Sequence, residues 1–84
     1  MLLIGRAFFF LTLLRLSLAS NNLRVVPREI GRLVKLQVLY LSRNQLETVP
    51  AQLGELTCLT RLSLFSNKLK RLPPTLANCK SLDW

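Results

Sequence analysis

The chain has 84 residues, half of them hydrophobic and 19% charged, so one small folded unit is expected and a disordered chain is excluded. Twelve basic residues against four acidic ones give a net charge of +8, which favours acidic proteins, anionic membranes or nucleic acid as partners. The absence of histidine from the sequence excludes Ser-His-Asp and Cys-His catalysis and histidine metal sites. Composition thus removes most hydrolases and leaves the partner open.

The first twelve residues form an apolar segment that contains three consecutive phenylalanines. Residues 1–12 are predicted to be a degenerate repeat, because Ala7 and Phe10 fall on the apolar positions that Ile30 and Leu33 occupy one period later. The run is too short to span a bilayer.

A secretory signal is the second interpretation of this region. In it Arg6 precedes the apolar run and cleavage follows Ala19, which would make the chain secreted or membrane-associated. Arg15 interrupts the signal, and cleavage after Ala19 would remove the first strand of a well-formed repeat. The degenerate repeat and a cytoplasmic location are therefore preferred.

Three consecutive 23-residue repeats follow, each with the pattern L-x-x-L-x-L-x-x-N-x-L. They span residues 13–35, 36–58 and 59–81, and residues 82–84 begin a fourth unit. Residues 13–84 are thus predicted to form one repeat domain. Because neither end carries a polar cap, which repeat arrays need, the chain is expected to be a piece of a longer protein or a short isoform.

The repeat pattern predicts one strand and one turn in every unit. The alternating leucines indicate a short strand with its leucines inward, and such strands stack in parallel. An asparagine follows each strand, where its amide can bond backbone groups that the turn leaves unpaired, so a structural role is assigned to Asn21, Asn44 and Asn67.

The second half of each repeat predicts a helical or 3-10 segment on the opposite side. A proline fixes φ and suits the start of that segment, as at Pro27, Pro50 and Pro73. Gly31 and Gly54 are expected to mark its end, although Ala77 replaces glycine in the third repeat.

The leucines of the pattern are predicted to form the core, together with Val26, Val49, Ile30 and Leu53. Cys79 takes a leucine position, whereas Cys58 lies at a repeat junction. Both are interpreted as reduced thiols, because a bond between them would have to join a turn to a buried position.

Together with the second half, V/L-P-x-x-L/I-G-x-L, this pattern resembles the leucine-rich-repeat superfamily, in the 23-residue subclass that includes Scribble-type polarity scaffolds and the Ras-binding leucine-rich scaffold. The resemblance implies an α/β solenoid, a horseshoe segment with short parallel strands on its concave face and 3-10, helical or irregular segments on its convex face. It also implies a non-catalytic protein-protein interaction module, such as an intracellular signalling scaffold, without cofactor or metal.

Extended concave surfaces are what solenoids use for binding, so the outward strand positions are the candidate site. The third, fifth, seventh and eighth positions of each repeat are Arg15, Ser17, Ala19, Ser20, Val38, Tyr40, Ser42, Arg43, Arg61, Ser63, Phe65 and Ser66, and Trp84 takes the third position of the fourth unit. The predicted partner-binding residues are Arg15, Val38, Tyr40, Arg43, Arg61, Ser63 and Phe65. Tyr40, Arg61 and Phe65 are the leading anchors, because aromatic and arginine side chains dominate protein interfaces.

Several alternatives stay open. Phe65 and Tyr40 can be ordinary surface residues, or Phe65 can fold over the sheet edge to cover apolar neighbours. The basic charge, including the cluster from Lys68 to Arg71, can serve an anionic membrane or nucleic acid, and the chain can be a piece of an extracellular receptor. An enzyme with a small-molecule substrate is not expected, since the four acidic residues, Glu29, Glu47, Glu55 and Asp83, are not paired.

Overall fold

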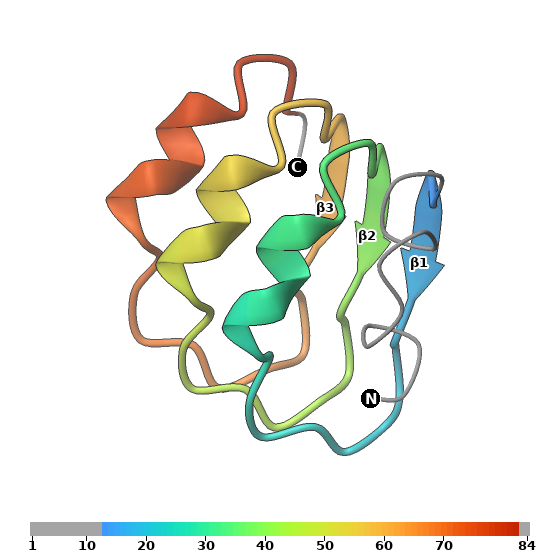
Figure 1. Cartoon of the computed structure of the whole chain (residues 1–84). Coiled ribbons are helices and arrows are strands. Elements are labelled where there is room, and N and C mark those ends of the chain that lie inside the picture. The colour runs from blue at the N-terminus through green and yellow to red at the C-terminus, as the bar shows by residue number, and fades with distance from the viewer. Residues whose placement is uncertain (1–12, 83–84) are drawn as a thin grey trace.

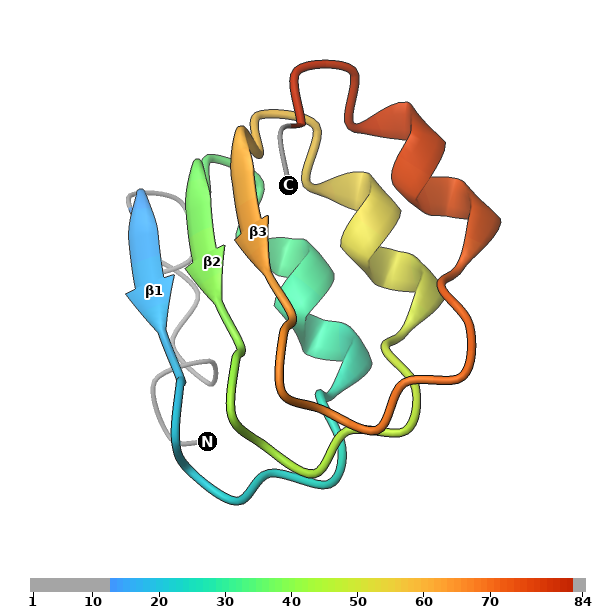
Figure 2. The same ribbon diagram turned by 180° about the vertical axis from the view of Figure 1, so that it is seen from behind.

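The computed structural model describes residues 13–82, in which every repeat contributes one strand and one 3-10 helix. The elements in chain order are β1 (Arg15–Ser17), η2 (Arg28–Arg32), β2 (Val38–Tyr40), η3 (Ala51–Glu55), β3 (Arg61–Ser63) and η4 (Pro74–Asn78). The strands form one layer and the 3-10 helices form a second layer that faces it (Figure 1). A long loop leads from each strand to the following 3-10 helix, and a shorter one leads from η2 and η3 to the next strand, as the reverse view shows (Figure 2).

The three strands form a parallel sheet in the order β1-β2-β3, and equivalent repeat positions pair with one another. Arg15 is opposite Val38, which is opposite Arg61, and the leucines Leu16, Leu39 and Leu62 form the next row. This register confirms the predicted stack of parallel strands, one per repeat. It follows from the 23-residue period, because a slip by one residue would turn the leucines away from the core.

The core is complete only in the middle of the stack. Leu39, Leu41 and Leu46 of the second repeat are fully buried, as are Ile30 and Leu53. The first and third repeats are less well covered. Leu59 and Leu62 of the third repeat are still buried, but the other pattern leucines of these two repeats are only partly buried: Leu13, Leu16, Leu18, Leu23, Leu64 and Leu69. Within residues 13–82 only the second repeat has a neighbour on both sides, and a solenoid unit needs such neighbours to cover its apolar face.

Leu72 departs from the predicted column of apolar residues for the same reason. Its counterparts Val26 and Val49 are buried, whereas Leu72 is 39% exposed. It belongs to the last described repeat, where no further unit packs against it within residues 13–82.

The prolines start the 3-10 helices as predicted, but the glycines do not end them. Pro27 and Pro50 precede η2 and η3 with φ of −68° and −72°, whereas Gly31 and Gly54 lie inside these helices, and neither has a positive φ. A Cβ at Gly31 would lie 2.9 Å from the carbonyl oxygen of Gln52. The glycines thus allow the helices of successive repeats to approach, and the prediction that they terminate the helices was wrong.

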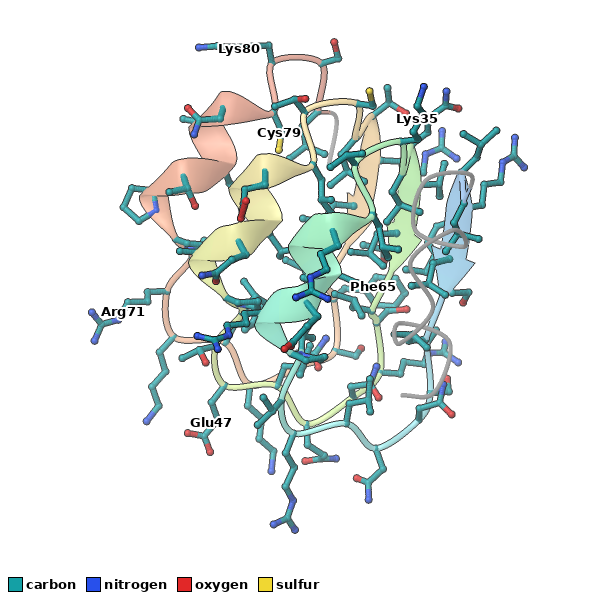
Figure 3. All side chains as sticks on the ribbon, in the orientation of Figure 1. Lys35, Glu47, Phe65, Arg71, Cys79 and Lys80 are labelled. Carbon is teal, nitrogen blue, oxygen red and sulfur yellow. The ribbon has the colours of Figure 1, made fainter. Side chains whose placement is uncertain are left out.

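The two cysteines are free thiols in different environments, since Cys58 is exposed, whereas Cys79 (Figure 3) is buried. The Cys79 thiol lies 3.3 Å from the carbonyl oxygen of Leu56 and 3.7 Å from that of Leu53, and it donates toward both. Burial raises the pKa of Cys79 above its ordinary value of 9.0. Among residues 13–82, no helix has the length and apolar character to cross a membrane.

Candidate protein-binding surface

The residues between the inward leucines of each strand lie on the outer side of the sheet. We call this surface the outer sheet face; it comprises Arg15, Ser17, Val38, Tyr40, Arg61 and Ser63, with Arg43 and Phe65 at the end where the strands turn. Alternation along a strand separates these side chains from the core. Short strands and a fixed register therefore hold side chains from three repeats on one surface.

Two rows of side chains cross the outer sheet face. In the first row, exposed Arg15 and Arg61 flank half-buried Val38. In the second row, half-buried Tyr40 lies between Ser17 and Ser63. Since serine is small, the tyrosine ring has no bulky neighbour in its own row.

Phe65 and Arg43 extend the outer sheet face beyond the strands. Phe65 is 61% exposed, an unusual state for a phenylalanine. Arg43 is exposed as well, and its backbone N–H donates to the carbonyl oxygen of Phe65 at 3.0 Å. The aromatic side chain and the guanidinium thus come from adjacent turns of neighbouring repeats.

Ser42 does not face outward, contrary to the prediction from its repeat position. It is only 7% exposed, because its turn is enclosed by the turns of both neighbouring repeats. Its carbonyl oxygen accepts from the backbone N–H of Ser20 at 3.0 Å and from Nδ2 of Asn44 at 3.2 Å. Ser42 therefore belongs to the packed turn.

The residue directly before each asparagine of the column adopts a left-handed conformation. Ser20, Arg43 and Ser66 have φ of 60°, 57° and 58°. This region is unfavourable for residues with a side chain, and it bends the chain sharply out of the strand. The bend brings the following asparagine back beneath the turn.

The asparagine column joins successive turns through side-chain amides. Asn44 Oδ1 accepts from the backbone N–H groups of Asn21 and Leu23 at 3.0 and 2.8 Å, while its Nδ2 donates to the carbonyl oxygens of Leu18 and Leu41 at 2.9 and 3.0 Å. The N–H groups of Asn21 and Leu23 would otherwise lack this acceptor in the turn. The amide thus ties the second repeat to the first.

Asn67 repeats this arrangement between the third and second repeats. Its Oδ1 accepts from the Leu46 N–H at 3.1 Å, and its Nδ2 donates to the carbonyl oxygens of Leu41 and Leu64 at 2.9 and 3.0 Å. Asn21 is exposed, and among the bonds of residues 13–82 its side-chain Nδ2 donates only to the carbonyl oxygen of Ala19. The column therefore stiffens the end of the sheet that carries Phe65 and Arg43.

Charge is distributed unevenly around the described molecule. The outer sheet face carries three arginines, Arg15, Arg43 and Arg61. The acidic residues of the described chain lie elsewhere, since Glu29 is in η2, Glu55 is in η3 and Glu47 is in the loop before η3. Within residues 13–82 the outer sheet face is thus basic and has no carboxylate of its own.

Metal binding finds no support in the described part of the chain. Residues 13–82 contain no group of three or more histidine, cysteine, aspartate or glutamate residues that could hold a metal ion. Each buried side-chain nitrogen and oxygen in that range has a hydrogen-bond partner. Trp84, Asp83 and the segment 1–12, to which the sequence assigned possible roles, lie outside the described residues.

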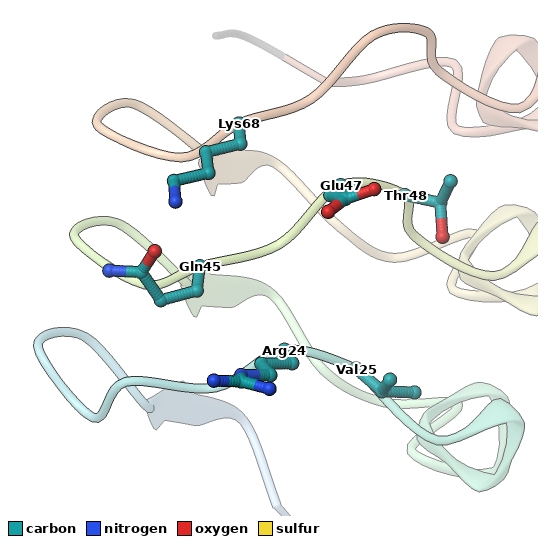
Figure 4. A pocket seen from close by; sticks show the side chains of 6 residues that line it. All are labelled: Arg24, Val25, Gln45, Glu47, Thr48 and Lys68. Carbon is teal, nitrogen blue, oxygen red and sulfur yellow. The ribbon is translucent and has the colours of Figure 1, made fainter.

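A second surface was not recognised from the sequence. The loops between the asparagine turns and the 3-10 helices, residues 22–25, 45–48 and 68–71, form what we call the loop flank. A recess of about 400 Å³ opens there, and it is lined by Arg24, Val25, Gln45, Glu47, Thr48 and Lys68 (Figure 4). The sequence drew attention to the basic cluster from Lys68 to Arg71 but did not place residues of the other two repeats beside it. The sequence did contain a signal for this surface, because the lining residues occupy equivalent positions in successive repeats.

The repeated strand, asparagine turn and 3-10 helix define a leucine-rich-repeat protein. The family profile described as leucine rich repeat matches residues 11–69, and the chain belongs to this family. Leucine-rich-repeat domains are generally non-enzymatic and mediate protein-protein interaction.

A solved structure of the leucine-rich-repeat protein LIC12759 from Leptospira interrogans is similar to this chain, with 28% sequence identity and a TM-score of 0.78. The match covers 90% of this chain and 25% of that protein, so the chain spans about a quarter of its length. No curated protein matches the sequence.

Proposed function

We propose that the chain is a non-catalytic binding module that holds a partner protein on its outer sheet face. One observation carries this proposal: Phe65 and the arginines of β1 and β3 are exposed on the same surface. The sheet and the asparagine column hold the three repeats of that surface in a fixed register. In a longer array this surface would be the concave side of a horseshoe. A rigid surface loses little entropy on binding, which favours affinity.

Tyr40, Arg61 and Phe65 are proposed as the main anchors. Aromatic rings and guanidinium groups provide large contact areas with few rotatable bonds or several hydrogen-bond donors. Arg15, Val38, Arg43 and Ser63 complete the contact surface around them. Val38 contributes apolar area between the two arginines of the first row.

The proposed partner presents an acidic patch to this surface. Arg15, Arg43 and Arg61 provide three positive charges, and no described carboxylate on the same face offsets them. Complementary charge raises the rate of encounter and selects against basic partners. Because the repeat pattern resembles that of Scribble-type and Ras-binding leucine-rich scaffolds, we propose that the chain acts as a cytoplasmic signalling scaffold.

Combined replacement of the anchors, Tyr40→Ala, Arg61→Ala and Phe65→Ala, tests the surface. Binding to a partner captured by crosslinking and identified by mass spectrometry should weaken at least about a hundredfold, because each anchor typically contributes 1 kcal/mol or more. Titration calorimetry with the purified partner measures the loss, and circular dichroism checks the fold. A variant with Arg32→Ala and Val34→Ala on the helix side is the control, since both residues are exposed there. Undiminished binding by the anchor variant would contradict the proposal.

Salt dependence separates this function from phosphate binding. A complex with a protein should retain most of its affinity between 50 and about 200 mM salt, whereas contacts to many phosphates would lose orders of magnitude. For the cellular location, a fusion with a reporter at the C-terminus, which leaves residues 1–19 at the N-terminus, should remain in the cytoplasm. Its appearance in the medium would contradict the cytoplasmic role.

A further inference from the structure

The loop flank carries charges of alternating sign on three successive repeats. Arg24, Glu47 and Lys70 occupy the same position in their repeats, the twelfth, and all three are exposed. The Lys70 N–H donates to the Glu47 carbonyl oxygen at 3.4 Å, which places the second and third of these loops side by side. The Gln45 N–H donates to the Leu23 carbonyl oxygen at 2.7 Å and does the same for the first and second.

Two members of this row, Arg24 and Glu47, line a recess together with other side chains of the loop flank. Arg24, Gln45 and Lys68 rise one above another from the three repeats, and the Glu47 carboxylate lies beside them (Figure 4). Glu47 and Arg71 point away from the backbone into solvent (Figure 3). Val25, which is 72% exposed, adds an apolar contact at the lining. The recess thus combines two positive charges around one negative charge with a small apolar area.

This charge order disfavours a partner of uniform charge. A nucleic acid backbone or an anionic vesicle would meet Arg24 and Lys70 favourably, but it would also press negative groups against Glu47. A repulsive group of this kind provides specificity by weakening the wrong partner. The charges that complement the row are acidic, basic and acidic in that order.

The spacing of the row fits an α-helix. Adjacent parallel segments lie about 4.8 Å apart, so the ends of the row are separated by about 10 Å. Residues at positions i, i+4 and i+7 of a helix lie on one face and are separated by about 5 to 6 Å at each step. A helix parallel to the stacking direction can therefore place one side chain opposite each of the three charges.

We propose that the loop flank is a second protein-binding surface, and that its partner is an α-helix with an acidic-basic-acidic stripe opposite Arg24, Glu47 and Lys70. This surface is separate from the outer sheet face, since it consists of loop residues and includes none of the anchors Tyr40, Arg61 and Phe65. Val25 packs against the stem of the partner helix beside the stripe.

Two helical peptides of equal composition test the charge order on the full 84-residue chain. The first carries Glu, Lys and Glu at positions i, i+4 and i+7 of an alanine-rich helix, and the second carries Glu, Glu and Lys at these positions. The second peptide mispairs two of the three charges in either direction along the row, whereas the first pairs all three. Fluorescence anisotropy should show about tenfold tighter binding of the first peptide, as expected for exposed pairs.

A charge exchange in the protein provides the decisive comparison. The double variant Glu47→Lys with Lys70→Glu keeps the net charge but changes the order along the row. It should bind the Glu-Glu-Lys peptide more tightly than the Glu-Lys-Glu peptide, which inverts the preference. Circular dichroism of both proteins and both peptides confirms that folding and helix content match.

A control variant of the protein and a polyanion complete the test. The pair Arg15→Ala with Arg61→Ala removes two charges from the outer sheet face and should leave the preference between the peptides unchanged. Loss of the preference in this control, or equal preference of the charge-exchanged variant and the original protein, would overturn the proposal. So would tighter binding of single-stranded oligothymidine than of the Glu-Lys-Glu peptide at about 150 mM salt, which would assign the flank to nucleic acid.

Discussion

Asn44 shows how much a single side chain contributes to a leucine-rich repeat. Its amide accepts two backbone N–H groups of the first repeat and donates to carbonyl oxygens of both repeats, while the side chain is almost completely buried. The carboxamide is suited to this position because it offers an acceptor and two donors at once. The equivalent residue of the first repeat, Asn21, is exposed, and its side chain makes fewer hydrogen bonds.

Replacing Asn44 should therefore be much more costly than replacing Asn21. Asn44→Ala leaves the N–H groups of Asn21 and Leu23 without their acceptor, and we expect the free energy of unfolding to fall by about 3 kcal/mol. Asn21→Ala should lower it by less than about 1 kcal/mol. Urea unfolding followed by circular dichroism measures both. Equal losses would show that the buried bonds of Asn44 add nothing beyond those of an exposed asparagine.

At the scale of the elements, each repeat is held by its neighbours more than by itself. The strands have three residues and the 3-10 helices five, too few for independent stability. Packing of η2 against η3 and of η3 against η4 compensates for this low stability of the single elements. This packing depends on a glycine at each contact. A Cβ at Gly54 would overlap the carbonyl oxygen of Thr75 in η4.

Gly54→Ala should destabilise the stack, although alanine normally favours a helical conformation. The added methyl group forces η3 and η4 apart, and we expect a loss of about 2 kcal/mol. Gly31→Ala should cost less, because its nearest contact, the carbonyl oxygen of Gln52, would lie at 2.9 Å. Thermal melting of the two variants gives the order. A melting temperature for Gly54→Ala at or above that of the unmodified chain would mean that the helices adjust freely.

At the scale of the whole molecule, the core is one continuous cluster that runs through all three repeats. The Cys79 thiol belongs to this cluster, so its ionisation is linked to unfolding of the array. Because its pKa is raised in the folded state, the proton is held more tightly there than in the unfolded chain. The protonated thiol therefore contributes to the free energy of unfolding. This contribution is complete below the ordinary pKa of 9.0 and is lost as the pH rises from that value toward the raised pKa.

The chain should therefore lose stability above about pH 9, with a slope from this group of at most about 1.4 kcal/mol per pH unit. The variant Cys79→Ala lacks the group and should show a shallower decline, whatever its stability at neutral pH. Urea unfolding at pH 7.5 and at about pH 10 gives both slopes. Cys79 is the one titratable group that differs between the two proteins, so parallel slopes would refute the link to Cys79.

The sequence by itself determined the strands, their parallel register and the position of the asparagine turns. It also determined the buried apolar positions that successive repeats share, such as Ile30 and Leu53. It could do so because a period repeated three times places equivalent residues in equivalent surroundings, and local geometry follows from the pattern within one repeat. The outward positions of Tyr40 and Arg61 follow from the same alternation.

Only the tertiary structure decided what depends on the neighbouring repeats. Gly54 is required by the approach of Thr75, Ser42 is enclosed by adjacent turns, and Leu72 is exposed because no described repeat covers it. The row of Arg24 and Glu47 on the loop flank likewise exists only after stacking. These features arise from distances between residues of different repeats, and such distances are set by packing between repeats rather than by the pattern within one.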